Sequence, residues 1–104
     1  MNKQINKINV FDKIRAWAIE RNLYEKGDVK TQYIKLQEES GELAQAILKK
    51  NKEEIIDAIG DTVVVLTNLS YMYGINIEDC IDTAYKEISN RKGKIINGTF
   101  VKND

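Results

Sequence analysis

The chain of 104 residues contains no proline. Proline ends helices more strongly than any other residue, because it lacks a backbone N–H and its ring clashes with the preceding turn. A chain without proline can form long uninterrupted helices, and a loop-rich fold is disfavoured. Apolar residues recur at spacings of three and four along most of the sequence, which is the period of one helix face. We therefore expect an all-α fold.

The periodic segments divide the chain into four expected helices. Their approximate ranges are 8–22, 30–49, 52–73 and 77–91. Asn51 and Asn76 stand at N-cap positions before the last two helices, and Gly74 supplies a left-handed stop between them. The segment 22–30 is interpreted as a linker. The sequence thus predicts a four-helix bundle-like arrangement within a single domain, residues 1–104.

A different pattern follows the last helix. Two short β-prone runs flank Asn97-Gly98 within residues 94–102, which is a strong signal for a β-hairpin. An isolated hairpin is marginally stable in water, so we expect Phe100 to lie against the bundle or a neighbouring subunit.

Several side chains on the periodic faces are interpreted as core. The expected buried stripe of the last helix comprises Ile77, Ile81, Ala84 and Ile88. Trp17 lies on the apolar stripe of the first helix, which favours core packing over stacking on a nucleobase, and both roles stay open. Cys80 lies beside the stripe of the last helix and is interpreted as a small buried hydrophobe.

Charge and composition exclude several classes of function. Lys+Arg and Asp+Glu are both 16, so no global basic field draws the chain to nucleic acid or to an anionic membrane. The absence of histidine removes zinc-protease motifs and Ser-His or Cys-His nucleophile pairs. One cysteine cannot form an intramolecular disulfide, no apolar run approaches membrane-spanning length, and the N-terminus lacks the apolar core of a secretory signal. We expect a cytoplasmic protein.

Acidic side chains cluster in the middle of two expected helices. Glu38, Glu39 and Glu42 share one edge of the second helix, at spacings of three and four. Asp57 and Asp61 project from one side of the third helix. Carboxylates this close repel one another, so a cation must offset their charge. Oxygen ligands suit Mg²⁺, with Mn²⁺ as a substitute, and these ions commonly join carboxylates to substrate phosphates.

The alternative is that these acids form a solvated helix face, which is common on surface helices. Two neighbouring glycines favour a site. Gly41 and Gly60 each lie inside an expected helix, at a cost of roughly 1 kcal/mol relative to alanine. Small residues beside acidic groups suggest the close approach of another helix or of a ligand.

At these residues the sequence resembles a family. The string KLQEESGELAQAILKK, followed by DAIGDTVVVLTNL, is similar to the MazG-like branch of the all-α nucleotide pyrophosphohydrolases, with its Glu-Glu-x-x-Glu and Glu-x-x-Asp motifs. The likeness extends to WAIERNL upstream and AYKEISNRKGK downstream. The Mg²⁺ ligands that it implies are Glu38, Glu39, Glu42 and Asp61. Ala58 departs from the pattern, because the second motif has glutamate there, and Asp57 could take over that carboxylate's role.

The activity that the resemblance implies is hydrolysis of (deoxy)nucleoside triphosphates to monophosphate and pyrophosphate, by metal-activated attack of water at the α-phosphorus. Without histidine, a glutamate has to be the general base, and Glu38 or Glu39 is the candidate.

Three basic side chains are candidates for holding the phosphates. Lys86 and Arg91 lie near the end of the last helix, and Lys35 lies one turn before the acidic cluster. Each has a plain alternative. Lys35 can simply pair with a glutamate one turn away, and the other two fit the usual preference for cations at a helix C-terminus.

Asn68 follows Asp61 by seven residues on the same helical face. It could donate to a metal-bound water or a nucleobase, or form a polar contact between subunits. A chain this short offers one acidic helix pair and little enclosed volume, so we expect a homo-oligomer, a dimer or tetramer whose subunits complete one another's sites. Two rival functions stay open: a non-catalytic helical interaction or adaptor module, and a related dUTPase-like or phosphoribosyl-ATP pyrophosphohydrolase.

Overall fold

The computed structural model describes residues 9–103. These form five helices and one two-stranded sheet: α1 Val10–Glu20, α2 Leu23–Lys26, α3 Val29–Lys49, α4 Lys52–Met72, α5 Ile77–Ile88, β1 Gly93–Ile96 and β2 Thr99–Lys102. The expected all-α fold class with a C-terminal hairpin is confirmed. Residue 8, the expected start of the first helix, lies outside the described residues.

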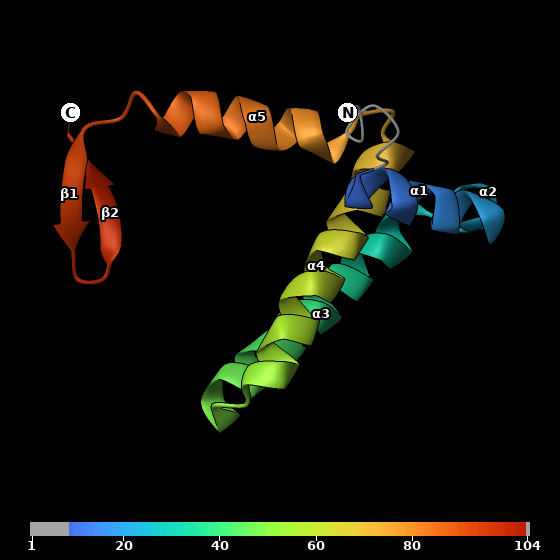
Figure 1. Ribbon diagram of the computed structural model, residues 1–104, viewed down its shortest axis with the longest axis horizontal. Coiled ribbons are helices and arrows are strands. Elements are labelled where there is room, and N and C mark those ends of the chain that lie inside the picture. The colour runs from blue at the N-terminus through green and yellow to red at the C-terminus, as the bar shows by residue number, and fades with distance from the viewer. Residues whose placement is uncertain (1–8, 104) are drawn as a thin grey trace, which may run out of the picture.

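The long helices α3 and α4 form an antiparallel hairpin at the centre of the molecule (Figure 1). Only Lys50 and Asn51 separate them. Lys50 is left-handed, with a φ of 57°, and its N–H donates to the carbonyl oxygen of Ala46. The Glu54 N–H donates to Asn51 Oδ1 at 3.1 Å, which is the predicted cap of α4. This tight turn fixes which residues of the two helices face each other.

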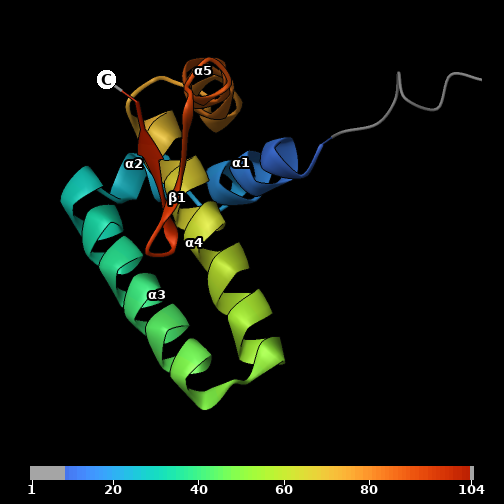
Figure 2. The ribbon, with the colours of Figure 1, turned by 90° about the vertical axis from the view of Figure 1, so that its left-hand side faces the viewer.

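Small side chains fill the interfaces between the helices. Ala18, Ala46 and Ala58 are at most 3% exposed, and they come from α1, α3 and α4 respectively. Figure 2 shows α1 lying across α4, on the side away from α3. Val65 and Ile77 complete the buried apolar residues of the described chain. A core built largely of alanine leaves most large apolar side chains at the surface.

Helix α5 does not fold back along this hairpin. It projects from the end of α4 and carries the β-hairpin at its far end (Figure 1). We call α5 together with the β-hairpin the C-terminal arm. Of the predicted buried stripe only Ile77 is buried, whereas Ile81 is 50% and Ile88 53% exposed. The prediction that Ile81, Ala84 and Ile88 are buried is therefore wrong for a single chain, because α5 leaves the other helices after its first turn.

The β-hairpin has the predicted turn. Asn97 and Gly98 take positive φ values of 52° and 82°, as the favoured two-residue hairpin turn requires. All residues of both strands are exposed. Phe100 does not lie against the helical bundle of its own chain. It borders a hollow on the arm with Ile88 and Arg91, and it stays 45% exposed.

Apart from shifts of one residue, the helices differ from the prediction at three places. Helix α1 ends at Glu20 instead of residue 22. The expected linker contains α2, which is a single turn and therefore too short to show a helical period. Helix α5 ends at Ile88 instead of continuing to residue 91. Side chains satisfy a carbonyl oxygen of its last turn, because Ser89 Oγ and Asn90 Nδ2 both donate to the carbonyl oxygen of Lys86.

An ion pair ties α1 to the beginning of α5. The Arg15 guanidinium, with a residue exposure of 8%, donates to both Glu78 carboxylate oxygens at 2.8 and 2.6 Å, and to Asp12 Oδ1 at 2.6 Å. These bonds hold the pKa of Glu78 down, at about 2. Asn76 stands at the N-cap position of α5, but its side chain makes no capping hydrogen bond. Arg15 therefore fixes the start of the arm where the predicted cap does not.

The expectations for Cys80 and for membrane-length segments need correction. Cys80 is exposed, because α5 leaves the other described helices after its first turn. Among the described residues, α4 is long and apolar enough to cross a membrane by length and composition alone. The core helix of a soluble protein can meet the same two criteria, and α4 packs along α3.

Candidate functional site

An open hollow of about 220 Å³ lies between α3 and α4, toward the turn that joins them. Its lining residues are Glu42, Gln45, Glu54, Asp57, Ala58 and Asp61. We call it the acidic hollow. Four of the six side chains are carboxylates, and they come from both helices. The structure thus brings together three of the five predicted metal ligands, Glu42, Asp57 and Asp61.

Glu39 lies on α3, one turn before Glu42. It is 5% exposed, and its Oε1 atom is buried without a hydrogen-bond partner. Burial raises the pKa of Glu39, and the negative charges of Glu42 and Asp61 raise it further. A buried carboxylate oxygen with no partner is costly, so the position favours a cation or a donor supplied from outside the chain.

Glu38 lies at the edge of this arrangement and is largely solvated. Its side chain is 59% exposed, and it does not line the acidic hollow. Lys35 Nζ lies 3.6 Å from Glu38 Oε1 and 3.7 Å from Glu39 Oε2. The simple pairing expected as an alternative role for Lys35 is therefore present, and it keeps an ammonium group beside the acids.

The acidic side chains do not form a ready-made metal cage. Within residues 9–103, no three Asp, Glu or Cys side chains lie close enough together to hold a metal ion. The donor chemistry nonetheless fits a hard divalent cation, because the hollow offers carboxylate oxygens and the amide oxygen of Gln45. The unpartnered oxygen of Glu39 adds a further donor.

Small residues give the hollow its room. Ala58 is 3% exposed and presents only a methyl group at the lining.

The close approach of another helix, expected at Gly41 and Gly60, is absent among the described residues. A Cβ added at either glycine would meet nothing within 4 Å. Both glycines face open space, because α1 and α3 reach α4 at other positions.

A more apolar groove borders the hollow. Its lining residues are Lys13, Ile14, Trp17, Asp61 and Val64, from α1 and α4. Trp17 is 50% exposed, so the core interpretation of this residue is wrong. The Arg21 guanidinium lies over the Trp17 ring, 4.6 Å from its centroid. Asp61 lines both cavities, which places an exposed aromatic face next to the acidic hollow.

Asn68 serves the packing of α2 on α4. It is 2% exposed, and its Oδ1 accepts a hydrogen bond from the Tyr24 hydroxyl at 2.6 Å. The Tyr24 ring packs against Tyr71 with a centroid distance of 4.4 Å, and burial raises the pKa of Tyr24. Asn68 does not line the acidic hollow, and the chain satisfies its amide oxygen internally.

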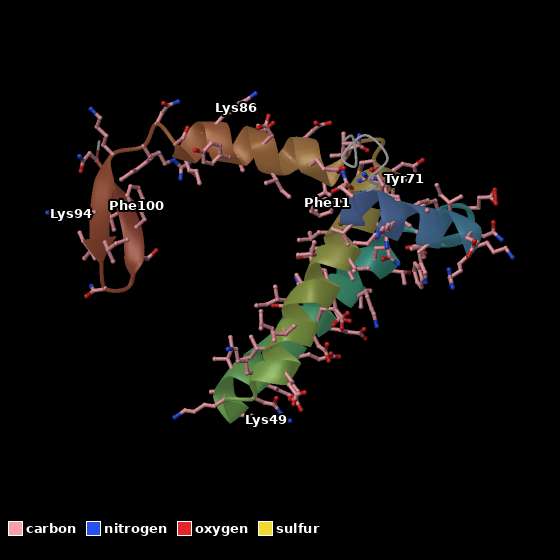
Figure 3. All side chains as sticks on the ribbon, viewed as in Figure 1. Phe11, Lys49, Tyr71, Lys86, Lys94 and Phe100 are labelled. Atoms are coloured by element: carbon pink, nitrogen blue, oxygen red, sulfur yellow. The ribbon has the colours of Figure 1, made fainter. Side chains whose placement is uncertain are left out.

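Lys86 and Arg91 are separated from the acids of their own chain. Figure 3 shows Lys86 on the C-terminal arm, far from Lys49 at the α3–α4 turn beside which the hollow lies. Lys86 Nζ pairs with Asp82 at 3.1 Å, and Arg91 pairs with Glu87 at 2.7 Å. One chain alone does not bring these two cations to the site.

The sequence interpretation missed Glu54 and Gln45 as lining residues. Glu54 takes part in the cap of α4 through its backbone N–H, and its carboxylate, 3.7 Å from Lys49 Nζ, lines the hollow. A spacing signal was present, because Glu54 precedes Asp57 by three residues and Asp61 by seven, all on one helix edge.

Comparison with known proteins gives two matches. Residues 28–96, well over half of the chain, match the family profile described as the MazG nucleotide pyrophosphohydrolase domain. An uncharacterised 18.2 kDa protein from the rep-hol intergenic region of Haemophilus phage HP1 (strain HP1c1) is 44% identical over 57 residues, which cover 55% of this chain and 35% of that protein. The match therefore spans little more than a third of that relative. No solved structure matches the chain.

Proposed function

This chain belongs to the MazG nucleotide pyrophosphohydrolase family, and from that premise we propose that it hydrolyses nucleoside triphosphates to monophosphate and pyrophosphate with the help of Mg²⁺. One observation carries the proposal. Glu39 is buried with an unpartnered carboxylate oxygen, and the charges of Glu42 on its own helix and Asp61 on the facing helix act on it. A divalent cation would satisfy this group and would offset the charge of a polyphosphate bound beside it.

The residues that would hold the cation are Glu39, Glu42, Asp57 and Asp61. Their oxygens are the ligands that Mg²⁺ prefers, and Mn²⁺ would be accepted by the same set. When bound, the cation would neutralise charge on the phosphates and make an attacking water more acidic. Asp57 lines the hollow beside Ala58, which supports its role in place of the carboxylate that the motif has at that position.

Glu38 is the general base in this proposal. It is adjacent to Glu39 in the sequence and its side chain is solvated, so in this proposal it would accept the proton of the attacking water. Lys35 Nζ lies 3.6 and 3.7 Å from the two glutamates, and in this proposal it would bind a phosphate oxygen of the substrate. The exposed face of Trp17 beside Asp61 would stack on the nucleobase.

A second copy of the chain is part of the proposal. The chain exposes 8458 Å², whereas a compact protein of 11.9 kDa is expected to expose about 6,000 Å². The difference exceeds the roughly 1,600 Å² buried in a standard interface. A partner's C-terminal arm would cover exposed apolar surface and could bring Lys86 and Arg91 to the phosphates. We propose a homo-oligomer of this kind acting in the cytoplasm, with neither nucleic acid nor membrane as a partner.

The test is pyrophosphate release with Mg²⁺ across standard and damaged dNTPs, dUTP and phosphoribosyl-ATP. Substitution Glu39→Gln should lower kcat by at least about a hundredfold, because it removes a ligand charge from the reacting site. The matched control is Glu53→Gln, an exposed acid outside the hollow, which should keep full activity. Equal activity of Glu39→Gln and the parent would refute the site.

The same panel separates the rival functions. A preference for dUTP or phosphoribosyl-ATP would identify one of the related enzymes. A helical adaptor would release no pyrophosphate from any substrate, and its melting temperature would not respond to Mg²⁺ with nucleotide.

A further inference from the structure

Glu54 has a place in the acidic hollow that its capping role does not explain. It lies in the first turn of α4, and its side chain lines the hollow with Asp57 and Asp61. Residues 54, 57, 58 and 61 follow one edge of the helix, so the two aspartates and Glu54 face the same space. On the opposite wall, α3 contributes Glu42 and Gln45.

The Glu54 carboxylate has only a weak partner. Lys49 Nζ lies 3.7 Å from Glu54 Oε1, and the two side chains are 61% and 50% exposed. An exposed pair of this kind contributes roughly 0–1 kcal/mol, so little holds the carboxylate away from a stronger ligand. Ala58 adds only a methyl group to the lining between Glu54 and Asp61, which leaves room for the longer glutamate side chain to reach inward.

A separate observation points to a ligand in this space. Glu39, 5% exposed, has a buried Oε1 atom with no partner, and it lies within the influence of Glu42 and Asp61, two residues of the lining. Glu39 does not itself line the hollow, and Lys35 Nζ lies 3.7 Å from its other oxygen, Oε2, but none of the residues that do line the hollow is basic.

We propose that Glu54 is a ligand of the divalent cation, which extends the site one turn toward the start of α4 and supplies the carboxylate that Ala58 does not. This inference rests on the proposed cation-dependent function and names one more residue for it. No three acids of the described residues lie close enough to hold a metal ion as they stand, so Glu54 has to turn from Lys49 toward Asp57 and Glu42 when the cation binds.

The experiment is calorimetric titration of the full chain with MnCl₂ alone, which needs no nucleotide and no turnover. Glu54→Gln should raise the Mn²⁺ Kd about tenfold or more, because ligand charge sets affinity at such sites. Gln suits the third position of a helix as well as Glu does, so the cap by Asn51 is preserved. Glu53→Gln is the matched control, since it removes the same charge from the same turn, and its Kd should stay within about twofold of the parent.

A second variant separates ligation from distant charge. Glu54→Asp keeps the charge but withdraws the carboxylate by one methylene, so a weakened Kd in this variant identifies a direct ligand. If Glu54→Gln and Glu53→Gln bind Mn²⁺ equally well, the assignment of Glu54 is refuted while the cation site stands. If the parent itself binds no Mn²⁺, the proposed cation dependence fails, and the role of Glu54 fails with it.

Discussion

At the scale of the residue, Glu39 lowers the stability of the folded chain and, in the proposed function, binds the cation. Its side chain is buried, and one carboxylate oxygen has no partner among the described residues. Because burial and the charges of Glu42 and Asp61 raise its folded pKa above the ordinary 4.5, ionisation of Glu39 destabilises the fold as the pH rises. That penalty is present at neutral pH, and a bound cation would remove it.

Substitution of Glu39 by glutamine should therefore stabilise the chain when no divalent cation is present. In EDTA at pH 7, the free energy of unfolding of Glu39→Gln should exceed that of the parent by about 1 kcal/mol, because a buried charge that Lys35 offsets only in part is lost. Urea denaturation measures this difference. Glu38→Gln is the control, because its exposed side chain should change the stability little. Addition of Mg²⁺ should stabilise the parent and not Glu39→Gln, and a Glu39→Gln variant that unfolds more easily in EDTA would contradict the argument.

At the scale of the element, Arg15 decides how α5 leaves the bundle. Its guanidinium joins α1 to the first turn of α5 through two bonds to Glu78. A largely buried guanidinium needs such partners, so the direction of the arm is tied to α1 and not only to the connection after α4. The link thus joins the first turn of the arm to α1.

The Arg15–Glu78 link predicts a pH-dependent stability. The folded pKa of Glu78 is about 2 against an ordinary 4.5, so its contribution is complete above pH 4.5 and is lost as the pH falls through about 2. Glu78→Gln should lower the free energy of unfolding by about 1.5–3 kcal/mol at pH 7. This deficit relative to the parent should shrink toward zero near pH 2, as measured by urea denaturation across the pH range.

The control for this pair is Asp12→Asn, which removes the other carboxylate from the same arginine. The Asp12 side chain is 52% exposed, so its loss should cost less than about 1 kcal/mol. A deficit of Glu78→Gln that does not depend on pH would show that Glu78 acts through packing and not through its charge.

At the scale of the whole molecule, the shape is open. The radius of gyration is 16.9 Å, compared with about 13 Å for a compact domain of this size. Figure 1 shows the reason, since the C-terminal arm stands away from the α3–α4 hairpin. On the arm Tyr85 is 62% and Ile95 69% exposed. An unpartnered apolar face of this extent is typical of an interface.

Disruption of the arm's apolar face should therefore give monomers. Ile88→Glu, at a position 53% exposed in one chain, should shift sedimentation toward the 11.9 kDa species and lower kcat at least tenfold, because a buried charge opposes association. Thr83→Glu adds the same charge elsewhere on exposed α5 and should change neither property. A parent chain that sediments as a monomer at micromolar concentration would refute the proposed assembly.

The sequence by itself determined the local structure. The helical period, Asn51 as a cap, Gly74 as a stop and Asn97-Gly98 as a hairpin turn all act over a few residues, and the structure contains each of them. The spacing of the acids also predicted that Asp57 and Asp61 share one edge, which the lining of the acidic hollow confirms.

Only the tertiary structure decided which faces are covered. A helical period states which residues share a face, but their burial depends on what lies opposite, and that is set by contacts between distant segments. Helix α5 is joined to α1 through the Arg15–Glu78 pair and then leaves the other helices, so Ile81 and Ile88 are exposed although their spacing is that of a core stripe. The α3–α4 turn brings Glu54 and Glu42 to the lining of one hollow, a relation between two helices that no spacing within one helix can encode.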